Sequence, residues 1–421
     1  MLYDRWLRIA RQNRARLALR DLASGEQWTF SQLAQARPPH SQPTHGLCCP
    51  RGNRASFILE LLDGWRAGRI VCPLEAGQSP PNLPAPPAET VHLKFTSATT
   101  QRARLVAFTA EQLAADADHI VATMGLRPDW PNLGVISLAH SYGFSNLVLP
   151  LLLHGVPLFL LEAAWPEMVR PACSLAPHLT LAAVPALWRA WHEASALPAN
   201  LRLAISAGAP LPLPLETAIY GQCGLKIHNF YGATECGGIA YDSSAVPRQD
   251  ASCIGAPLQD VRLSLDSQGC LEVRGAAVGS TYWPTPAATL DQGCYRTSDL
   301  ADLRDGMVYL RGRAGDQINV AGRKVSPESI EHELLRHERV QDCLVFGAPS
   351  PEAERSEMVV ACVVVEPSVR IEDLRQFLLE RLPAWQVPRE WRVVESLSPN
   401  QRGKLSRTEW RKRLGYVPAA S

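Results

Sequence analysis

Short apolar runs alternate with amphipathic helical patterns over most of the chain between residues 91 and 299. The runs lie at 133–138, 158–161, 179–184 and 201–206. Continuous apolar runs of this length are typical of strands that are buried on both faces, and such strands alternate with helices in parallel sheets. The pattern therefore predicts an α/β fold, with a large layered domain of parallel strands covered by helices.

Strict alternation of polar and apolar residues marks a second kind of segment. It occurs at 261–273 around a turn at 266–269, which predicts an antiparallel hairpin. We therefore expect a smaller β-rich subdomain beside the layered domain. At the start of the chain, residues 1–35 predict a helix, a strand with a turn, and a second helix that opens at Phe30.

A different succession of elements follows residue 316. The pattern predicts a hairpin, a helix, two strands and a helix, at 318–325, 327–337, 343–347, 358–365 and 371–382. Together they would form a compact α+β unit. With 421 residues, the chain exceeds one ordinary domain of roughly 150 residues, so two unequal domains are expected.

Composition limits the classes of partner and compartment. The formal net charge of +1 gives no overall attraction to nucleic acid or to an anionic membrane. No run approaches the roughly 18 consecutive apolar residues of a membrane span, and residues 1–20 carry charge throughout instead of a signal-peptide core. We expect a cytoplasmic protein with no nucleic-acid partner and no membrane span. The eleven cysteines include no Cys-x-x-Cys pair, which predicts reduced structural thiols.

Three polar segments supply the chemistry for activating a carboxylate with ATP. They are Tyr-Gly-Ala-Thr-Glu at 231–235, Tyr-Arg-Thr-Ser-Asp-Leu at 295–300 and Gly-Lys-Leu-Ser-Arg at 403–407. Attack of a carboxylate on the α-phosphate requires a hydroxyl near the phosphates, a carboxylate for Mg²⁺, an anchor for the ribose and a bridging cation. The residues of these types are Thr234, Glu235, Asp299 and Lys404.

The order and spacing of these segments resemble the adenylate-forming (ANL) superfamily over about residues 47–407. That superfamily contains acyl- and aryl-CoA synthetases, acyl carrier protein ligases and nonribosomal adenylation domains. The segment Gly-Arg-Ala-Gly-Asp at 312–316 matches its junction between two domains. The resemblance implies an adenylate-forming N-terminal domain at 1–312, a hinge at 313–316 and a small mobile C-terminal domain at 317–421.

The resemblance assigns roles to the residues of the first two segments. Thr234 would hold the α-phosphate and Glu235 would bind Mg²⁺. Asp299 would accept hydrogen bonds from the ribose hydroxyls, and Arg313 would add a second ribose contact. The alternative interpretations are a helix or turn cap for Asp299 and a solvated surface acid for Glu235. The predicted nucleotide site also includes Tyr231, Gly232, Gly208 and Ala209.

The segment at 94–104 takes the place of the family's phosphate loop. Its hydroxyls could donate to phosphate oxygens, and Arg104 could replace the usual lysine with a fork-shaped donor. The glycines that let a backbone approach an anion closely are replaced by Ala98 and Gln101. A hydroxyl-rich turn without any phosphate contact is the alternative interpretation. The hydroxyl-bearing candidates are Thr96, Ser97, Thr99 and Thr100.

The small domain would contribute three further features by the same resemblance. Lys404 would be the catalytic cation that bridges the carboxylate and the α-phosphate while charge develops. Gly315 occupies the hinge position, about which the small domain would rotate after adenylation. Gly322 and Arg323 would then line the pantetheine tunnel.

The segment at 138–144 bears on the acid that is activated. It resembles acyl- and aryl-acid ligases rather than amino-acid-activating domains, which supply an aspartate for the substrate ammonium. An ammonium buried without a counter-charge would be costly, so an amino acid is disfavoured. Aromatic residues and glycines suit a flat apolar acid, and an aromatic or short acyl acid is expected. His140 is equally interpretable as a packing residue. The pocket candidates are His140, Tyr142, Gly143, Phe230 and Gly237.

The implied function is ATP-dependent conversion of a small carboxylic acid to acyl-AMP, with Mg²⁺ as cofactor, followed by transfer to a phosphopantetheine thiol. No carrier segment follows residue 407, so the acceptor would come in trans, as CoA or as an acyl carrier protein. The altered phosphate loop leaves another class open. This is a catalytically degenerate protein that binds an acyl-adenylate or a carrier protein.

Overall fold

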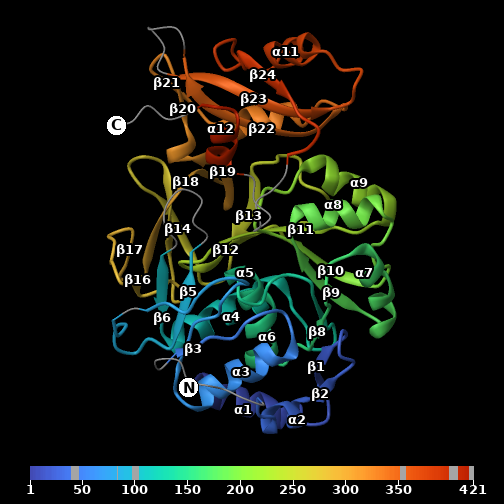
Figure 1. Ribbon diagram of the computed structural model, residues 1–421, viewed down its shortest axis with the longest axis vertical. Helices are drawn as coiled ribbons and strands as arrows, with labels where there is room; N and C mark the ends of the chain where they lie inside the picture. The colour runs from blue at the N-terminus through green and yellow to red at the C-terminus, as the bar shows by residue number, and fades with distance from the viewer. Residues whose placement is uncertain (39–46, 83, 97–103, 351–356, 398–405, 417–421) are drawn as a thin grey trace.

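The computed structural model of the chain describes residues 1–38, 47–82, 84–96, 104–350, 357–397 and 406–416. Figure 1 shows a large part and, above it, a smaller part formed by the C-terminal residues. Both contain helices and strands, and each has its own buried apolar clusters. The predicted α/β class, with a large N-terminal and a small C-terminal unit, is confirmed.

Parallel strands form one half of the large sheet, where the apolar runs predict them. Their order is β11, β10, β9, β7, β8 and β1, and every neighbouring pair is parallel. The short strand β2 (Gln27–Thr29) closes this edge antiparallel to β1. The parallel strands are β1 (Leu17–Asp21), β7 (Asn132–Gly134), β8 (Leu158–Leu160), β9 (Leu179–Ala183), β10 (Leu201–Ser206) and β11 (Ile227–Ala233).

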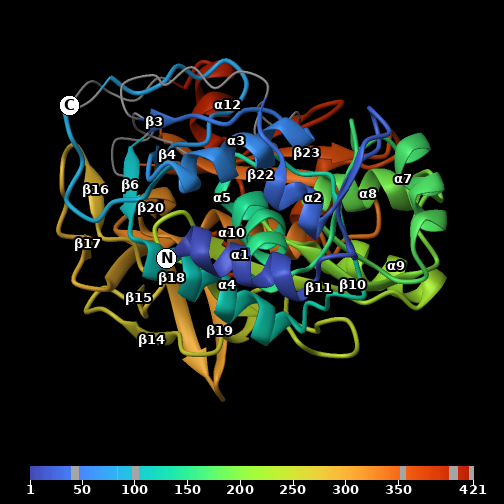
Figure 2. The same ribbon diagram turned by 90° about the horizontal axis from the view of Figure 1, so that it is seen from below.

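Helices surround these strands, and local capping fixes where they begin and end. In α4, the Thr109 side chain accepts from the Gln112 N–H at 3.3 Å, and Gly125 ends the helix at φ +67°. Figure 1 shows α1 at the end of the molecule that is remote from the C-terminal part, and Figure 2 shows the same end from below. The helices are α1 (Leu2–Gln12), α2 (Phe30–Gln35), α3 (Ala55–Arg66), α4 (Ala110–Met124), α5 (Ser141–Gly143), α6 (Leu149–His154), α7 (Pro166–Ala172), α8 (Pro185–Glu193) and α9 (Leu213–Cys223).

Beyond β11 the same sheet becomes antiparallel. The predicted hairpin at 261–273 is β14–β15, in which Leu263 lies opposite Val273. The strand order continues from β11 through β12, β13, β19, β18 and β15 to β14, so the predicted β-rich region extends the large sheet. These strands are β12 (Gly237–Tyr241), β13 (Cys253–Pro257), β14 (Arg262–Leu265), β15 (Cys270–Arg274), β17 (Leu290–Asp291), β18 (Cys294–Arg304) and β19 (Met307–Arg313).

A second sheet of five strands has the order β16, β6, β5, β4 and β3. Its antiparallel pair β5–β6 holds both described ends of the predicted phosphate loop. The strands are β3 (Leu47–Cys48), β4 (Ile70–Val71), β5 (His92–Phe95), β6 (Leu105–Phe108) and β16 (Thr281–Trp283).

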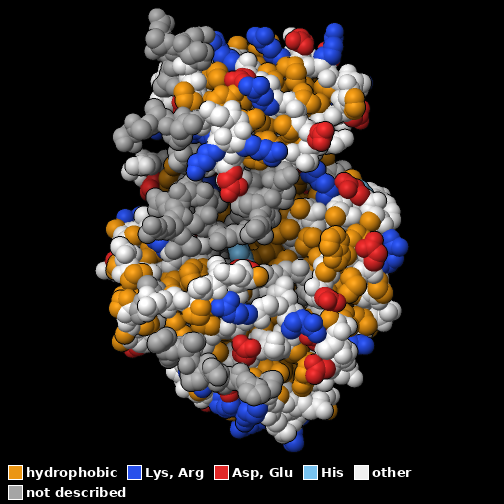
Figure 3. All heavy atoms as spheres, viewed as in Figure 1, with side chains coloured by type: hydrophobic (Ala, Val, Ile, Leu, Met, Phe, Trp, Pro, Cys, Tyr) orange, Lys and Arg blue, Asp and Glu red, His pale blue; other side chains and the backbone are white. Residues whose placement is uncertain are grey.

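The C-terminal part begins after a 3₁₀ turn at Ala314–Asp316, which coincides with the predicted hinge. Its three-stranded sheet has the order β22, β23, β24, beside the separate hairpin β20–β21. On the face shown in Figure 3, basic and acidic side chains are interspersed over both parts. The elements are β20 (Ile318–Val320), β21 (Arg323–Val325), α10 (Pro327–Leu334), β22 (Val340–Pro349), β23 (Glu357–Val365), α11 (Ile371–Leu379), β24 (Glu390–Val393) and α12 (Arg407–Arg413).

Several predicted bounds are wrong, for local reasons. The strand expected at 133–138 ends at Gly134, and the Leu138 N–H donates to the Asn53 side chain instead of to a strand. The helix expected at 327–337 ends at Leu334, because the N–H groups of Arg336 and His337 bond three residues back in a tightened last turn. The strand expected at 343–347 is longer, since β22 pairs with β23 along its whole length.

No helix among the residues described is long and apolar enough to cross a membrane.

Candidate functional site

The turn between β11 and β12 carries Thr234 and Glu235. Both side chains are buried, at 8% exposure each, so the interpretation of Glu235 as a solvated surface acid is wrong. One Glu235 carboxylate oxygen accepts from the Tyr282 hydroxyl at 2.9 Å. Burial raises the pKa of the Glu235 carboxyl, while the Tyr282 hydroxyl and the Arg104 guanidinium act in the opposite direction. A buried carboxylate with these opposing influences on its pKa is suited to bind a cation.

Asp299 lies on β18 opposite Arg313 on β19. Arg313 Nε donates to one carboxylate oxygen at 3.1 Å, and the Tyr231 hydroxyl donates to the other. Burial and the neighbouring carboxylate raise the pKa of the Tyr231 hydroxyl well above its usual value, so it stays a neutral donor. Asp299 is thus a strand residue held between two donors, and its interpretation as a helix or turn cap is wrong.

The two described ends of the predicted phosphate loop meet at Thr96 and Arg104. The Thr96 N–H donates to the Arg104 carbonyl at 2.8 Å, and the Arg104 N–H donates to the Thr96 hydroxyl at 3.1 Å. The Arg104 guanidinium stacks 4.0 Å from the centre of the Tyr282 ring. Arg104 therefore lies close to Glu235, through Tyr282. Ser97, Thr99 and Thr100 lie outside the described residues.

Sequence reasoning missed Tyr282. The residue belongs to β16, where it lies opposite Val106 of β6, and it stands outside the three polar segments of the chain. The alternating strand around it indicates a buried aromatic side chain but gives no sign of a bond to Glu235. Tyr282 joins the loop end at Arg104 to the turn that carries Glu235.

Changing Tyr282 to phenylalanine should make activity more sensitive to acid. The variant keeps the ring beneath Arg104 but loses the hydroxyl that stabilises ionised Glu235, so the pKa of Glu235 rises further. A proton then occupies the carboxylate up to a higher pH, and the acidic limb of the pH–rate profile should move upward. Pyrophosphate exchange measured from pH 5.5 to 8.5 tests this, with Tyr220→Phe on α9 as the matched control. An unshifted acidic limb would contradict the proposed role of Glu235.

The predicted acid-pocket residues lie at the carboxyl ends of β9, β10 and β11. The Tyr142 hydroxyl donates to the carbonyls of Ala183 and Ile205 at 3.4 and 3.3 Å. The rings of Tyr142 and Phe230 lie 6.0 Å apart. Gly208 has φ +88°, and a Cβ there would lie 3.4 Å from Val184. Tyr142, Phe230 and Gly208 are therefore brought together, and Ala209 follows directly in the chain.

Three other predicted residues have structural reasons for their identity. His140 precedes α5, and its Nδ1 accepts from the Tyr142 N–H at 3.3 Å, as a helix cap does. A Cβ on Gly143 would lie 2.0 Å from the Ser137 carbonyl oxygen. In β11, a Cβ on Gly232 would lie 2.7 Å from the Gly237 carbonyl oxygen. Close backbone approach explains both glycines, and a role of His140 or Gly143 in the pocket stays a prediction.

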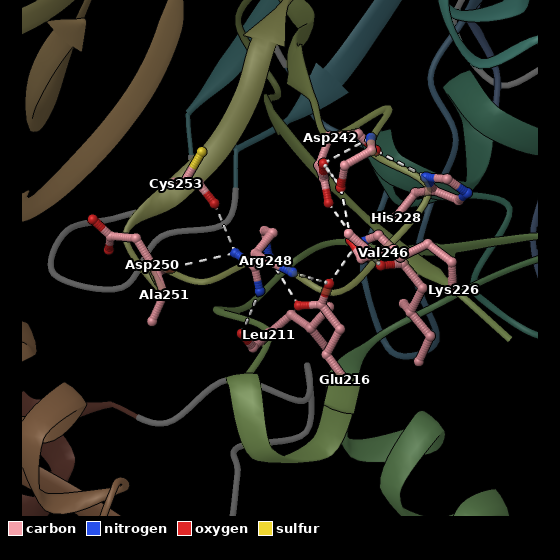
Figure 4. Close-up of polar contacts among 12 residues, drawn as sticks. Leu211, Glu216, Lys226, His228, Asp242, Val246, Arg248, Asp250, Ala251 and Cys253 are labelled. Carbon is pink, nitrogen blue, oxygen red and sulfur yellow. Dashed lines mark hydrogen bonds and ion pairs between the residues drawn. The ribbon is translucent and has the colours of Figure 1, made fainter. Parts of the chain in front are cut away.

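A buried ionic network supports the turn that follows Gly208 (Figure 4). Glu216 on α9 accepts from Lys226 and, at 2.9 Å, from Arg248. Lys226 also bonds Asp242 at 2.6 Å. Arg248 donates onward to the Leu211 carbonyl at 2.8 Å. The network thus joins α9, the start of β11 and the chain around Leu211, and it supports the segment that carries Gly208 and Ala209 of the predicted nucleotide site.

The predicted residues of the small domain are placed only in part. Lys404 lies outside the described residues. Arg407 of α12 bonds Glu331 at 2.8 Å, Glu328 at 2.9 Å and Asp316 at 3.2 Å. Burial raises the pKa of Glu331 to about 7, although Arg407 acts in the opposite direction. Arg407 therefore connects α12 to α10 and to the turn at the predicted hinge.

The hairpin β20–β21 carries the two residues predicted for the pantetheine tunnel. Gly322 has φ +81° in its turn, and the Arg323 guanidinium lies 5.5 Å from the centre of the Trp385 ring. In Figure 1 this hairpin lies in the upper part of the molecule, apart from β11 and β12. The hairpin that carries Gly322 and Arg323 is therefore not next to the strands β11 and β12. Gly315 lies within the 3₁₀ turn Ala314–Asp316.

The metal predicted at Glu235 is Mg²⁺, and the residues fit it. No group of three His, Cys, Asp or Glu side chains suited to a metal ion occurs in the part of the chain that is described. Mg²⁺ usually keeps several waters and binds through one or two carboxylates together with substrate phosphates. The buried Glu235 carboxylate could supply such a protein ligand.

Comparison with known proteins identifies the family. The model described as AMP-binding enzyme matches residues 37–283, and that of the AMP-binding enzyme C-terminal domain matches residues 329–404. A feruloyl-CoA synthase from Amycolatopsis sp. is 29% identical over 364 residues, 81% of this chain and 73% of the relative. A sulfoacetate–CoA ligase from Cupriavidus necator is 28% identical over 356 residues, 79% of this chain and 68% of the relative.

A solved structure gives the same fold. MatB from Rhodopseudomonas palustris with ATP bound superimposes with a TM-score of 0.85 over 98% of this chain and 99% of that one, at 19% identity. The first family model covers more than half of the chain, and both models occur in the order that the sequence motifs predict. The chain therefore belongs to the AMP-binding enzyme family, within the adenylate-forming superfamily.

Proposed function

We propose that this protein converts a small carboxylic acid to its acyl-adenylate with ATP and then transfers the acyl group to the thiol of CoA. The observation that carries the proposal is the arrangement of Asp299 between Tyr231 and Arg313, next to the buried Thr234–Glu235 turn in the same sheet. The enzyme class has independent support, because the curated relatives are named CoA synthases and ligases. The predicted class of AMP-forming acid–CoA ligase is confirmed at that level.

Each of these residues has a separate role in the first half-reaction. Each oxygen of the Asp299 carboxylate can accept more than one hydrogen bond, so it can receive ribose hydroxyls while it keeps Tyr231 and Arg313. Thr234 donates to the α-phosphate, and Glu235 holds Mg²⁺. When bound, Mg²⁺ neutralises charge on the phosphate oxygens. An oxygen of the acid forms a bond to the α-phosphorus, the bond to the β-phosphate oxygen breaks, and pyrophosphate leaves.

Lys404 acts at the same point of the reaction, as a cation shared by the acid oxygen and the α-phosphate. In the second half-reaction the thiol sulfur bonds to the acyl carbon, its proton is released, and AMP leaves. Rotation about Gly315 would present Gly322 and Arg323 to the incoming pantetheine. The proposed acceptor is CoA. An acyl carrier protein is the alternative, and it would use the same thiol chemistry.

The proposed acid is aromatic or short acyl. The residues Tyr142, Phe230 and Gly208 predicted for the pocket lie close together and contribute two aromatic rings and a glycine. An amino acid would bring an ammonium group to an apolar surface, which is unfavourable without a counter-charge. The acids named for the two relatives, feruloyl and sulfoacetate, differ from each other, so family membership alone does not choose the acid.

We expect acid-dependent exchange of pyrophosphate into ATP in the presence of Mg²⁺. Purified protein would be assayed with benzoic, cinnamic, short fatty and amino acids, and exchange should occur with an aromatic or short acyl acid and not with amino acids. Formation of the CoA thioester from that acid would then be followed directly. Exchange with amino acids alone would contradict the proposed substrate class.

A folded protein without exchange would favour the degenerate binding protein. That alternative is considered because Ala98 and Gln101 stand where the family's phosphate loop has glycines. Ala98→Gly together with Gln101→Gly separates the two explanations. A large gain in ATP affinity would mark the native loop as impaired, whereas no gain would show that the present residues suffice.

A further inference from the structure

A buried ion pair lies beneath the Thr234–Glu235 turn and takes no part in the chemistry described above. Lys94 on β5 and Asp116 on α4 are exposed by only 4% and 2%. Lys94 Nζ lies 3.7 Å from Asp116 Oδ2. Charges this deeply buried are costly unless they are paired and hydrogen-bonded, so their position requires an explanation.

The Asp116 carboxylate contacts the end of the turn directly. Its Oδ1 accepts from the Gly238 N–H at 3.1 Å. Gly237 has φ +69°, and a Cβ on it would lie 2.0 Å from the same oxygen. The backbone immediately after Glu235 is therefore packed against this carboxylate, and only glycine fits at position 237. The structure gives this reason for Gly237, which sequence analysis placed in the acid pocket.

The other side of the carboxylate is fully occupied as well. The Ser145 hydroxyl donates to Asp116 Oδ2 at 2.5 Å, and Lys94 Nζ lies 3.3 Å from the same hydroxyl. Lys94 Nζ also lies 4.8 Å from the centre of the Phe108 ring. The ammonium group is thus enclosed by an apolar ring, a hydroxyl and one carboxylate. It serves as the counter-charge of the buried Asp116 carboxylate.

The pair connects two segments of the proposed nucleotide site. Lys94 is the first residue of the segment 94–104 that takes the place of the phosphate loop, and Asp116 holds Gly238, three residues after Glu235. The turn has a second anchor at its other side, since the Gly279 N–H donates to the Glu235 carbonyl at 2.8 Å. With both anchors in place, the backbone that carries Glu235 is fixed before any ligand binds.

We propose that Asp116, with Lys94 as its counter-charge, is a positioning residue that sets the Thr234–Glu235 turn for Mg²⁺. The inference rests on the proposed function, in which Glu235 binds Mg²⁺. Residues that orient a metal ligand typically change metal affinity by about 10- to 100-fold when they are replaced. The proposed role of Asp116 depends on one acceptor atom, Oδ1. The effect of this atom on the turn can therefore be measured separately from the effect of the ion pair on stability.

Two double variants isolate that atom. Lys94→Met with Asp116→Asn removes both charges but keeps a carbonyl oxygen that can accept from Gly238. Lys94→Met with Asp116→Leu removes both charges and the acceptor and keeps the number of heavy side-chain atoms, although leucine is the larger residue. Because an apolar replacement of a buried ion pair is often tolerated, both proteins can fold. Should the leucine variant not fold, Asp116→Ala in the same background removes the acceptor with less steric demand.

The first readout requires no activity. Hydrogen–deuterium exchange should be faster in the leucine variant than in the asparagine variant for peptides that cover 234–238, and equal for peptides of β22 and β23. The second readout is the Mg²⁺ concentration for half-maximal pyrophosphate exchange, which should be at least about 10-fold higher in the leucine variant. Equal exchange of the turn peptide and equal Mg²⁺ requirement in the two variants would overturn the inference.

The unmodified protein is assayed beside them. Absence of pyrophosphate exchange in that protein would count against the proposed function, while the deuterium readout would still decide whether Asp116 holds the turn. A difference in thermal unfolding between the variants without a difference in the turn peptide would assign the pair a purely structural role and contradict the inference.

Discussion

Replacing Lys404 with alanine should lower the rate of adenylation by about a thousandfold and leave thioester formation from supplied acyl-adenylate largely intact. A cation that contacts both reacting oxygens is most valuable where charge develops, which is at the α-phosphate during attack by the acid. The second half-reaction develops its charge at the acyl carbon, after the proposed rotation about Gly315 has moved the lysine away. Pyrophosphate exchange measures the first step, and release of AMP from synthetic acyl-adenylate with CoA measures the second.

Lys412→Ala is the matched control for this experiment. Lys412 is an exposed lysine in the last turn of α12, so its removal changes the net charge of the small domain equally. The bonds of Arg407 to Glu328 and Glu331 are untouched by either substitution, and both proteins should unfold at similar temperatures. Equal loss of both half-reactions in Lys404→Ala would contradict a small domain that works with two different faces.

The fold was predictable where one pattern has one structural solution. The apolar run at 201–206 is β10 with parallel neighbours, and the alternation at 261–273 is the hairpin β14–β15. The way in which these regions join was not predictable. β11 is parallel to β10 but antiparallel to β12, so one strand links the two halves of the sheet. Hydrophobic periodicity describes the faces of a strand and contains no information about its neighbours.

The candidate site was predictable where chemistry lies in a contiguous motif, and less so where it depends on distant partners. Thr234, Glu235 and Asp299 follow from the polar segments, and the structure brings Asp299 together with Arg313. Tyr282 and Asp116 had no such signal. Each bonds the 235–238 turn from more than forty residues away in the sequence. A tyrosine in a strand and an aspartate on a helix are too common for a single sequence to mark them as functional.

Asp299→Asn should lower kcat/KM for ATP by about 100-fold, a loss of roughly 2.7 kcal/mol in transition-state stabilisation. The amide keeps the shape of the side chain, but it loses the charge, and one of its two ends becomes a donor. That donor must face either Arg313 Nε or the Tyr231 hydroxyl, which both donate to Asp299 now. Facing Arg313 Nε, the amide loses that bond; facing the Tyr231 hydroxyl, it keeps a bond only if the hydroxyl becomes the acceptor. In both cases the acceptors proposed for the ribose hydroxyls are reduced from two to one.

The same two strands provide a matched control for this substitution. Asp302 of β18 bonds Arg311 of β19 at 2.8 Å, three residues further along, but this pair is 42% and 47% exposed. Exposed ion pairs contribute little, so Asp302→Asn should change kcat/KM by less than about threefold. Steady-state kinetics with varied ATP at saturating acid compares the two variants. Similar small effects at both positions would show that Asp299 does not bind the nucleotide, because its lower exposure of 19% and its contact with Tyr231 distinguish it from Asp302.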